Sequence, residues 1–468
     1  MSKLSNAPLA KQMSDSEAGR PDLLHEAAQR ASRYLAELDQ RAAFPTSEAL
    51  AGLAAFDEPL PEKPLSPAET LKLLDEAGSP ATTASAGGRY FGFVIGGSLP
   101  VTLAANWLAG AWDQNAGLIA TSPVSAKLEA VALQWVLSVL GLPADAGVGF
   151  VSGATMANFS GLAAARHAIL KRAGWDVEAQ GLFGAPPITV IVGDEVHVSL
   201  LKALSLLGFG KERVVRVPVD DQGRMQVDAM PKISGPTIVC IQAGNVNSGA
   251  FDPADEICHI AHQAGAWVHV DGAFGLWAAA APARAHLAVG VSEADSWATD
   301  AHKWLNVPYD SGLVICRNAD DLHSALTHSK AAYLVGGEQR EPSEYSSEMS
   351  RRARGIEVWA ALRTLGRSGV AEMVERCCQH AERFAEGLSA AGYEILNDVQ
   401  LNQVLVSFGD DDKTRRVIQA VQQDGTCWCG GTVWHGRAAM RISVSSWATT
   451  EVNVLQSLQA MLRCAAAA

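Results

Sequence analysis

One lysine of this chain stands in an unusual setting for a solvated cation. Lys303 lies between an imidazole and an indole in the stretch Asp300-Ala-His-Lys-Trp304, and the apolar strand pattern Gly312–Cys316 follows soon after it. From this stretch alone two interpretations are open. Lys303 is either a surface lysine on a turn or a lysine kept reactive to form an imine with a carbonyl compound.

Three other groups of residues have types that could bind a ligand. Ser152-Gly-Ala-Thr155 leads from a predicted strand into a predicted helix; free N–H groups at such a helix start bind phosphate, although a plain tight turn has the same composition. Asp271 ends an apolar run, where a buried carboxylate requires a partner; an N-cap or a structural salt bridge is the alternative. His197 follows the apolar run Ile188–Gly193, and a structural role is the alternative for it too.

The chain from residue 147 onward predicts the elements that position these groups. Short apolar runs alternate with helical periodicity, which indicates a mostly parallel sheet covered by helices. In such a sheet ligands bind at the carboxyl ends of the strands, where all four groups fall. A phosphate cradle, an imidazole facing a ring, a carboxylate for a ring nitrogen and an imine-forming lysine are together what pyridoxal phosphate requires.

Composition and charge limit the class of protein. The chain has 468 residues, of which 48% are hydrophobic and 19% charged, which is typical of a large folded core with more than one domain. The formal net charge of -13 argues against nucleic acid as a partner. We find no apolar run suited to a membrane span and no secretory signal, so we expect a cytoplasmic protein. The spacing of the eight cysteines predicts no metal site.

We expect three regions along the chain. Residues 1–85 are predicted to form an N-terminal helical segment, residues 86–367 a large cofactor-binding domain, and residues 368–468 a small C-terminal α/β domain. Within the first region, Leu23–Gln40 has the periodicity of an amphipathic helix and Ser66-Pro-Ala-Glu69 has the pattern of a capped helix start. Helices in this position often pack on a partner subunit, so the first region is a candidate dimer arm.

The chain resembles the group II pyridoxal-phosphate-dependent amino acid decarboxylases, the family of aromatic L-amino acid, histidine and glutamate decarboxylases. The matching stretches are Arg89-Tyr-Phe-Gly92, Thr121-Ser-Pro123 with Glu129, Val151-Ser-Gly-Ala-Thr155, Asp194 to His197, His269-Val-Asp-Gly-Ala273 and Asp300-Ala-His-Lys-Trp304. The resemblance implies an α/β fold of the fold type I class of pyridoxal-phosphate-dependent transferases. It also implies a homodimer with the active site at the subunit interface.

The resemblance further implies a role for each candidate site residue. Lys303 would form the Schiff base with pyridoxal 5'-phosphate, Asp271 would pair with the pyridine nitrogen, and His197 would stack on the ring. Tyr333 matches a loop tyrosine that supplies a proton to the substrate carbon, with His197 as the other candidate. The remaining expected contacts are Ala273 on the other ring face, Gly153, Ala154, Thr155 and His302 around the phosphate, and Asn245 at the phenolic oxygen.

The implied activity is decarboxylation of an L-amino acid to the amine and carbon dioxide. The alternatives with the same cofactor are an oxidative aldehyde synthase, another carbon–carbon lyase, or aminotransfer. In the family, phenylalanine in place of the loop tyrosine accompanies aldehyde formation, so Tyr333 favours decarboxylation. A non-catalytic sensor would need an attached DNA-binding module, and the N-terminal region has no basic recognition helix.

The substrate is less clearly indicated than the cofactor. The chain departs from the family pattern at Ala154–Ala157, at Gly244–Gly249 and at Gly272. An aromatic or apolar substrate side chain is favoured by Tyr90, Phe91, Phe93 and Trp107, with core packing as the alternative for each of them. For the stretch from Trp428 to His435 we prefer a structural role over an approach to the site.

Overall fold

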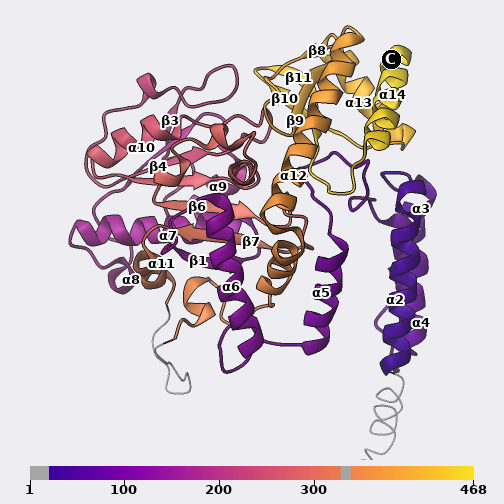
Figure 1. The fold of residues 1–468 in the computed structure, drawn as a ribbon, viewed down its shortest axis with the longest axis horizontal. Helices are drawn as coiled ribbons and strands as arrows, with labels where there is room; N and C mark the ends of the chain where they lie inside the picture. The colour runs from indigo at the N-terminus through magenta and orange to yellow at the C-terminus, as the bar shows by residue number, and fades with distance from the viewer. Residues whose placement is uncertain (1–19, 328–338) are drawn as a thin grey trace, which may run out of the picture.

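The computed structural model describes residues 20–327 and 339–468, and its centre is a seven-stranded sheet (Figure 1). The strand order is β1-β7-β6-β5-β4-β2-β3, and the neighbours from β6 to β3 are all parallel, whereas β7 is antiparallel to both β6 and β1. The strands are β1 (Gly147–Val151), β2 (Thr189–Gly193), β3 (Val215–Val217), β4 (Thr237–Gln242), β5 (Trp267–Asp271), β6 (Ser296–Asp300) and β7 (Gly312–Cys316). The predicted mostly parallel sheet is confirmed.

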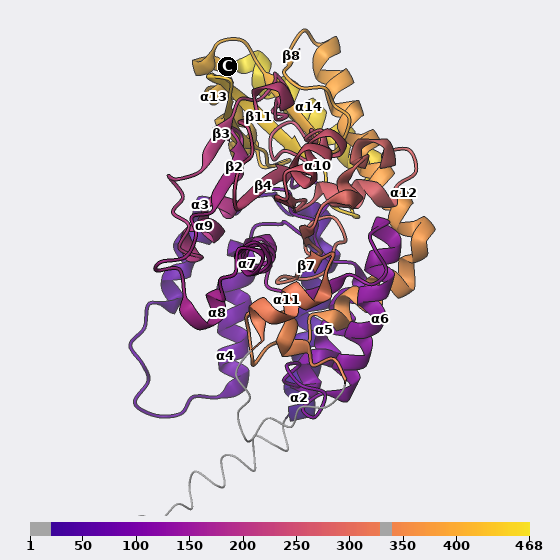
Figure 2. The ribbon, with the colours of Figure 1, turned by 90° about the vertical axis from the view of Figure 1, so that its left-hand side faces the viewer.

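Helices cover both faces of this sheet, which explains why its strands are almost continuously apolar. One core cluster holds Val239 and Val268 on one face, and a second holds Ile238 and Trp267 on the other, as the alternation of side chains along a strand requires. The second face is covered by α7 (Ala154–Arg172), α9 (Val198–Leu206) and α11 (Ala319–Leu326), with α8 (Val177–Gln180) beside α7; the first is covered by α6 (Pro123–Leu140), α10 (Ala254–Gln263) and α12 (Gly355–Ala390). Figure 2 shows α7 and α6 on opposite sides of β7.

Helix α6 is long and apolar enough to cross a membrane by length and composition alone, with a mean hydropathy of 1.2 over its 18 residues. Its apolar side chains are used inside the protein, however. Ala132, Val136 and Leu137 are buried in the main core, where α6 packs on α12. These are the properties of a core helix of a folded domain.

The C-terminal part of the chain forms a second, antiparallel sheet of four strands in the order β10-β11-β9-β8. Its elements are β8 (Glu394–Ile395), β9 (Gln403–Ser407), α13 (Asp411–Asp424), β10 (Gly430–Trp434), β11 (Arg437–Ser443) and α14 (Glu451–Ala467). Helix α12 leads into this part and is interrupted at Gly366, whose φ of 60° lies in the left-handed region. We propose the boundary between the large and the small domain at this interruption, with residues 368–468 as the small domain.

The N-terminal helices stand apart from the central sheet in Figure 1. They are α2 (Arg20–Glu37), α3 (Ser47–Gly52) and α4 (Pro67–Leu73), followed by α5 (Pro100–Trp112), which lies closer to the large domain. The side chain of Ser66 accepts a hydrogen bond from the Glu69 N–H at the start of α4, as the capping pattern predicts. Arg30 of α2 pairs with Asp75 beyond α4 at 2.7 Å, which ties the two helices together.

Candidate active site

Lys303 lies in the turn that follows β6, and its ammonium group is held by a carboxylate of the same turn. Lys303 Nζ is 3.0 Å from Oδ2 of Asp300, whose side chain is 2% exposed. The other oxygen, Oδ1, accepts the N–H of Ala154, the first residue of α7, at 2.6 Å. One carboxylate therefore joins the lysine to the helix start that the sequence predicts as a phosphate cradle.

His302 is fixed by its backbone neighbours and by an aromatic ring. Its Nδ1 accepts the N–H of Ser311 at 3.1 Å, so the proton of the neutral ring belongs on Nε2. The ring stacks on Tyr309, with centroids 4.2 Å apart. Burial lowers the pKa of His302 and raises the pKa of Tyr309 to about 12, so both groups are neutral at ordinary pH.

His197 immediately precedes α9, and, like His302, it accepts a backbone N–H on Nδ1. Its Nδ1 accepts the N–H of Ser199 at 3.3 Å and lies 2.7 Å from the hydroxyl of the same serine. Burial lowers the pKa of His197, a shift that the nearby carboxylate of Asp271 opposes and Lys303 reinforces. His197 is therefore a neutral imidazole that carries its proton on Nε2.

Asp271 ends β5, and a buried chain of hydrogen bonds orients its carboxylate. Its Oδ2 accepts from Asn158 Nδ2 at 3.1 Å, and Asn158 Oδ1 lies 2.9 Å from Nε2 of His269. The His269 Nδ1 lies 2.8 Å from the hydroxyl of Ser296, and burial lowers the pKa of His269 to about 3. A neutral His269 thus donates to Asn158, which fixes the amide so that its NH2 group faces Asp271.

The residues after β1, β2 and β6 enclose one cavity of about 330 Å³, within the range of roughly 300–1,000 Å³ that suits small-molecule ligands. It is lined by Ser152, Gly153, Ala154, Thr155, Met156, His197, Ser199, Asp300, His302, Lys303 and Tyr309. Gly153 lies close to this space, and a Cβ there would make a tight contact of 3.2 Å with the His302 ring. Six of the predicted site residues are thereby brought together.

This site fits pyridoxal phosphate in its chemistry. Among the described residues no lysine or arginine pairs with Asp271, although its side chain is only 4% exposed. A buried carboxylate without a cation is suited to a protonated ring nitrogen. Lys303 supplies the amine, and Gly153 to Thr155 supply N–H groups at the start of a 19-residue helix for the phosphate.

The other four predicted site residues are not among those that line the cavity, and one of them is Asp271, at the end of β5. Ala273 follows Asp271 and donates its N–H to that carboxylate at 3.3 Å, but it does not line the cavity. Asn245 lies in the turn after β4, where its Oδ1 accepts the N–H groups of Asn247 and Ser248; it is also absent from the cavity lining. Tyr333 lies outside the described residues. The proposed cofactor contacts of these residues stay predictions.

A loop from the N-terminal side, Arg89–Gly97, packs directly on the lysine turn. A Cβ on Gly96 would collide with the backbone carbonyl of Lys303, and one on Gly92 would collide with the ring of Trp428. Trp428 stacks on Tyr90 at 5.1 Å and on Phe93 at 5.4 Å, measured between ring centroids. Phe93 itself has a φ of 55°, a strained conformation for a bulky residue that the surroundings must enforce.

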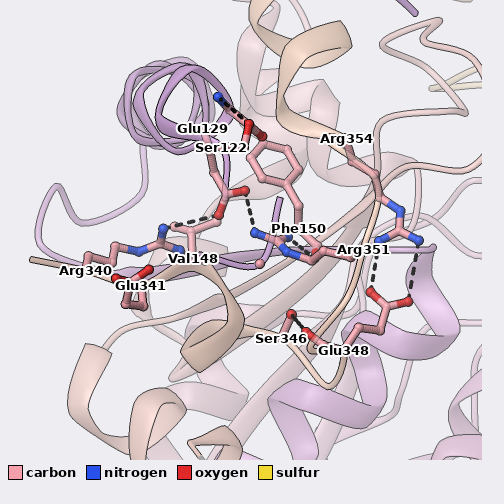
Figure 3. A network of polar contacts seen from close by, with 12 residues as sticks. Ser122, Glu129, Val148, Phe150, Arg340, Glu341, Ser346, Glu348, Arg351 and Arg354 are labelled. Atoms are coloured by element: carbon pink, nitrogen blue, oxygen red, sulfur yellow. Dashed lines mark hydrogen bonds and ion pairs between the residues drawn. The ribbon is translucent and has the colours of Figure 1, made fainter. Parts of the chain in front are cut away.

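A buried ion-pair network joins α6 to the segment from Arg340 to Arg354 (Figure 3). Glu129 of α6 receives Arg351 at 2.6 Å and Arg340 at 3.2 Å, and the side chains of Glu129 and Arg351 are both 1% exposed. Arg351 also donates to the carbonyl of Phe150 in β1. Glu129 was part of the recognised pattern, and its role in this structure is to neutralise two arginines.

Sequence reasoning assigned no role to Asn158, Asp300 or Tyr309. Asp300 stood in the quoted motif beside Lys303, so its position was available as a signal. No sequence signal marked Asn158 or Tyr309. Asn158 meets Asp271, and Tyr309 meets His302, only in the folded chain.

Comparison with known proteins identifies the family. The family model described as the pyridoxal-dependent decarboxylase conserved domain matches residues 58–409. The chain belongs to the pyridoxal-dependent decarboxylases. It is a pyridoxal-phosphate-dependent amino acid decarboxylase, a carboxy-lyase, and its small-molecule substrate is an amino acid.

Two curated relatives and one solved structure illustrate the likeness. The chain is 27% identical to an aromatic-L-amino-acid decarboxylase of Bacillus atrophaeus, over 88% of this chain and 87% of the relative. It is 29% identical to a mouse acidic amino acid decarboxylase, over 68% and 59% of the two chains. The crystal structure of Oryza sativa TDC with PLP and tryptamine superposes with a TM-score of 0.88 at 22% identity, covering 100% of this chain and 99% of that chain. This likeness confirms the fold type I α/β architecture.

Proposed function

We propose that the pyridoxal-dependent decarboxylase described here acts on L-amino acids with an aromatic side chain, through a Schiff base on Lys303. The observation that carries the choice of Lys303 is the cavity after β1, β2 and β6. It gathers a lysine, two neutral histidines and the start of α7 around one space of suitable size.

When bound, pyridoxal phosphate supplies the electron sink that accepts the electrons of the broken carbon–carbon bond. The residues of the chain do the rest. The Lys303 amine would hold the cofactor through its aldehyde, Asp271 would keep a proton on the ring nitrogen, and His302 Nε2 with the N–H groups from Gly153 to Thr155 would hold the phosphate. His197 would stack on the ring, and its Nε2–H, like the Tyr333 hydroxyl, is a candidate to deliver a proton to the substrate carbon.

The preference for an aromatic side chain is supported by the aromatic residues beside the lysine turn. Tyr90 and Phe93 each stack on Trp428, and the loop that carries them packs on the Lys303 backbone. Flat rings of this kind bind another ring by offset stacking. One relative is an aromatic-L-amino-acid decarboxylase and another acts on acidic amino acids, so family membership alone does not choose between them.

A product screen tests this proposal. The protein is incubated with pyridoxal phosphate and a pool of L-amino acids, and the products are identified by mass spectrometry. An aromatic amine is the expected product, whereas an acidic or basic amine would overturn the substrate assignment. An aldehyde with ammonia would move the protein to the aldehyde synthase alternative and remove Tyr333 as the proton donor.

The role of Lys303 is tested separately by trapping. Borohydride should fix the cofactor to the tryptic peptide that contains Lys303, and Lys303→Ala should abolish the label. Lys202→Ala, a change in α9 outside the cavity lining, is the control and should leave the label unchanged. A label on another lysine would refute the assignment.

We further propose a homodimer with the active site at the subunit interface. Support comes from large apolar side chains that one chain leaves exposed: Trp107, Leu108 and Trp112 on α5, and Leu50, Leu53 and Phe56 in the N-terminal region. Large apolar side chains that stay exposed on a single chain are what a subunit interface would cover. Light scattering should give twice the chain mass, and a monomer with full activity would contradict the proposal. The expected cytoplasmic location stays a prediction.

A further inference from the structure

An ion-pair cluster outside the cavity joins the connection between β5 and β6 to the second half of α12. Arg284 donates from Nε and Nη2 to the two carboxylate oxygens of Glu375, at 2.9 and 3.0 Å. Its Nη2 also donates to Glu382 at 2.7 Å, and its Nη1 donates to the carbonyl of Gln400 at 2.9 Å. One arginine beside the central sheet therefore holds three residues of the C-terminal part of the chain.

The geometry of this cluster requires an arginine. The Arg284 side chain is 13% exposed, so water screens its ion pairs less than it screens a pair on the surface. The two hydrogen bonds to Glu375 use the planar fork of the guanidinium, which a lysine ammonium cannot reproduce. These hydrogen bonds lower the pKa of Glu375 and raise the pKa of Arg284, so both groups stay charged at ordinary pH. The other polar neighbours are neutral: Gln379 donates to Glu375 at 3.3 Å, and burial raises the pKa of the Cys378 thiol.

The second half of α12 is not oriented by its own helix alone. The helix is interrupted at Gly366, whose backbone is not helical, and both Glu375 and Glu382 follow that point. Figure 1 shows α12 extending from the central sheet to the C-terminal sheet. Because an interrupted helix can bend, its second half takes its direction from contacts with its surroundings. The cluster around Arg284 supplies such contacts.

The same half of α12 contacts the residues that hold the lysine turn. Arg376, next to Glu375 in the helix, donates to the carbonyl of Trp447 at 2.9 Å. The N–H of Trp447 donates to Oδ1 of Asn306 at 2.9 Å, and Asn306 lies three residues after Lys303. A continuous chain of contacts thus leads from the ion-pair cluster to the turn that carries the lysine.

We propose that Arg284 is a positioning residue for Lys303. It fixes the second half of α12, which holds Trp447 and, through it, Asn306. Arg284 does not line the cavity, so it acts on the lysine only through these contacts. This inference rests on the proposed role of Lys303 in holding the cofactor. The alternative is that Arg284 only stabilises the fold, and the two roles differ in where the effects of its loss are found.

Hydrogen exchange measures the support of the lysine turn directly, in the full-length chain with and without pyridoxal phosphate. In Arg284→Gln the N–H of Trp447 should exchange roughly tenfold faster or more, since charge-assisted hydrogen bonds that fix its surroundings are lost. Peptides from β4 and β5 should keep their exchange rates. Unchanged exchange at Trp447, or an equal increase in every segment, would overturn the inference.

The enzyme loaded with cofactor supplies a second measurement. A displaced lysine amine should lower kcat roughly tenfold or more, while KM for the amino acid stays within about threefold. The visible circular dichroism per bound cofactor should change as well, because it reports how the lysine holds the ring. A role in stability alone would leave both kcat per bound cofactor and the dichroism unchanged.

Further variants isolate the ion pair from other effects of the change. The reciprocal swap, Arg284→Glu with Glu375→Arg, keeps one cation between two carboxylates and should restore much of kcat and of the slow exchange at Trp447. Arg284→Lys keeps the charge without the fork and should give intermediate values. Arg437→Gln is the matched control, because Arg437 also pairs with both oxygens of one carboxylate, that of Glu394, within the C-terminal sheet. It should leave both measurements unchanged.

The outcomes separate this inference from the proposed function. If exchange at Trp447 and kcat in Arg284→Gln equal those of the natural chain, the inference is overturned, while trapping of the cofactor on Lys303 still stands. If trapping labels another lysine, the proposed function falls and this inference falls with it. Should Arg284→Gln fail to fold, Arg284→Lys decides by the same two measurements.

Discussion

Replacement of Glu129 by glutamine should destabilise the protein far more than its conservative character suggests. Glu129 and Arg351 are 2.6 Å apart, and each side chain is 1% exposed, so neither group has water to compensate for the loss of its partner. Removing one member of such a pair leaves a buried charge unpaired, which costs about 3–5 kcal/mol. Arg340, the second partner at 3.2 Å, is more exposed and adds less.

The measurement is chemical denaturation of the cofactor-free chain at equal protein concentrations. The shift in the denaturation midpoint, multiplied by the slope of the free energy of unfolding against denaturant, gives the loss of stability. Asp412→Asn is the control, because its pair with Arg415 is on the surface with Asp412 84% exposed, and its loss should cost below about 1 kcal/mol. A double variant, Glu129→Leu with Arg351→Met, should recover much of the stability, since it removes both buried charges. If Glu129→Gln falls within about 1 kcal/mol of the natural chain, this account of the network is refuted.

Three further changes test other parts of the structure. Burial raises the pKa of Asp252 from 3.8 to about 6. This group should therefore lower the free energy of unfolding by about 3 kcal/mol as pH rises from about 4 to about 6. Melting curves of Asp252→Asn, which cannot titrate, should lack this pH dependence, and subtracting them isolates it. Trp428→Ala removes two ring stacks worth about 0.5–1.5 kcal/mol each. If the whole of this free energy is lost from substrate positioning, kcat/KM for an aromatic substrate should fall by roughly 5- to 150-fold, with Trp428→Phe much closer to the natural chain in steady-state assays. Asn158→Ala leaves the buried Asp271 and His269 each short of a hydrogen bond and should destabilise the chain by about 1–3 kcal/mol in denaturant titrations; an unchanged midpoint would exclude the proposed chain of hydrogen bonds.

The part of the site that sequence reasoning found is the part set by local pattern. Lys303 and His197 each follow a recognisable apolar strand, and parallel strands bring their carboxyl ends to one edge, so their meeting in one cavity was predictable. Asn158 was not predictable, because it lies inside α7 and acquires its role only where that helix crosses β5. The pairing of Trp428 with Tyr90 depends on how the C-terminal sheet docks, which no local periodicity encodes.

The stretch from Trp428 to His435 has a packing role, as we preferred, and none of its residues lines the cavity. Its first residue is part of a packed aromatic group that reaches the lysine turn through the loop Arg89–Gly97, while its last five residues before His435 form the edge strand β10. A glycine at 92 and a glycine at 96 are both needed for this contact. These glycines stood in the glycine- and aromatic-rich segment, but their partners lie more than two hundred residues away in the chain.

The turn that carries Lys303 is held from three sides, and one of them is the C-terminal part of the chain, which contributes nothing to the cavity lining. Asn306, three residues after Lys303, donates to the carbonyl of Ser445 at 3.1 Å and accepts the N–H of Trp447 at 2.9 Å. Its own carbonyl accepts the N–H of Leu99 at 2.8 Å. Asn306 is fully buried with a φ of 56°, a left-handed conformation that asparagine adopts more readily than most residues. Since β6 fixes the other end of the turn, the position of the lysine amine depends on contacts from the N-terminal loop, the central sheet and the C-terminal domain together.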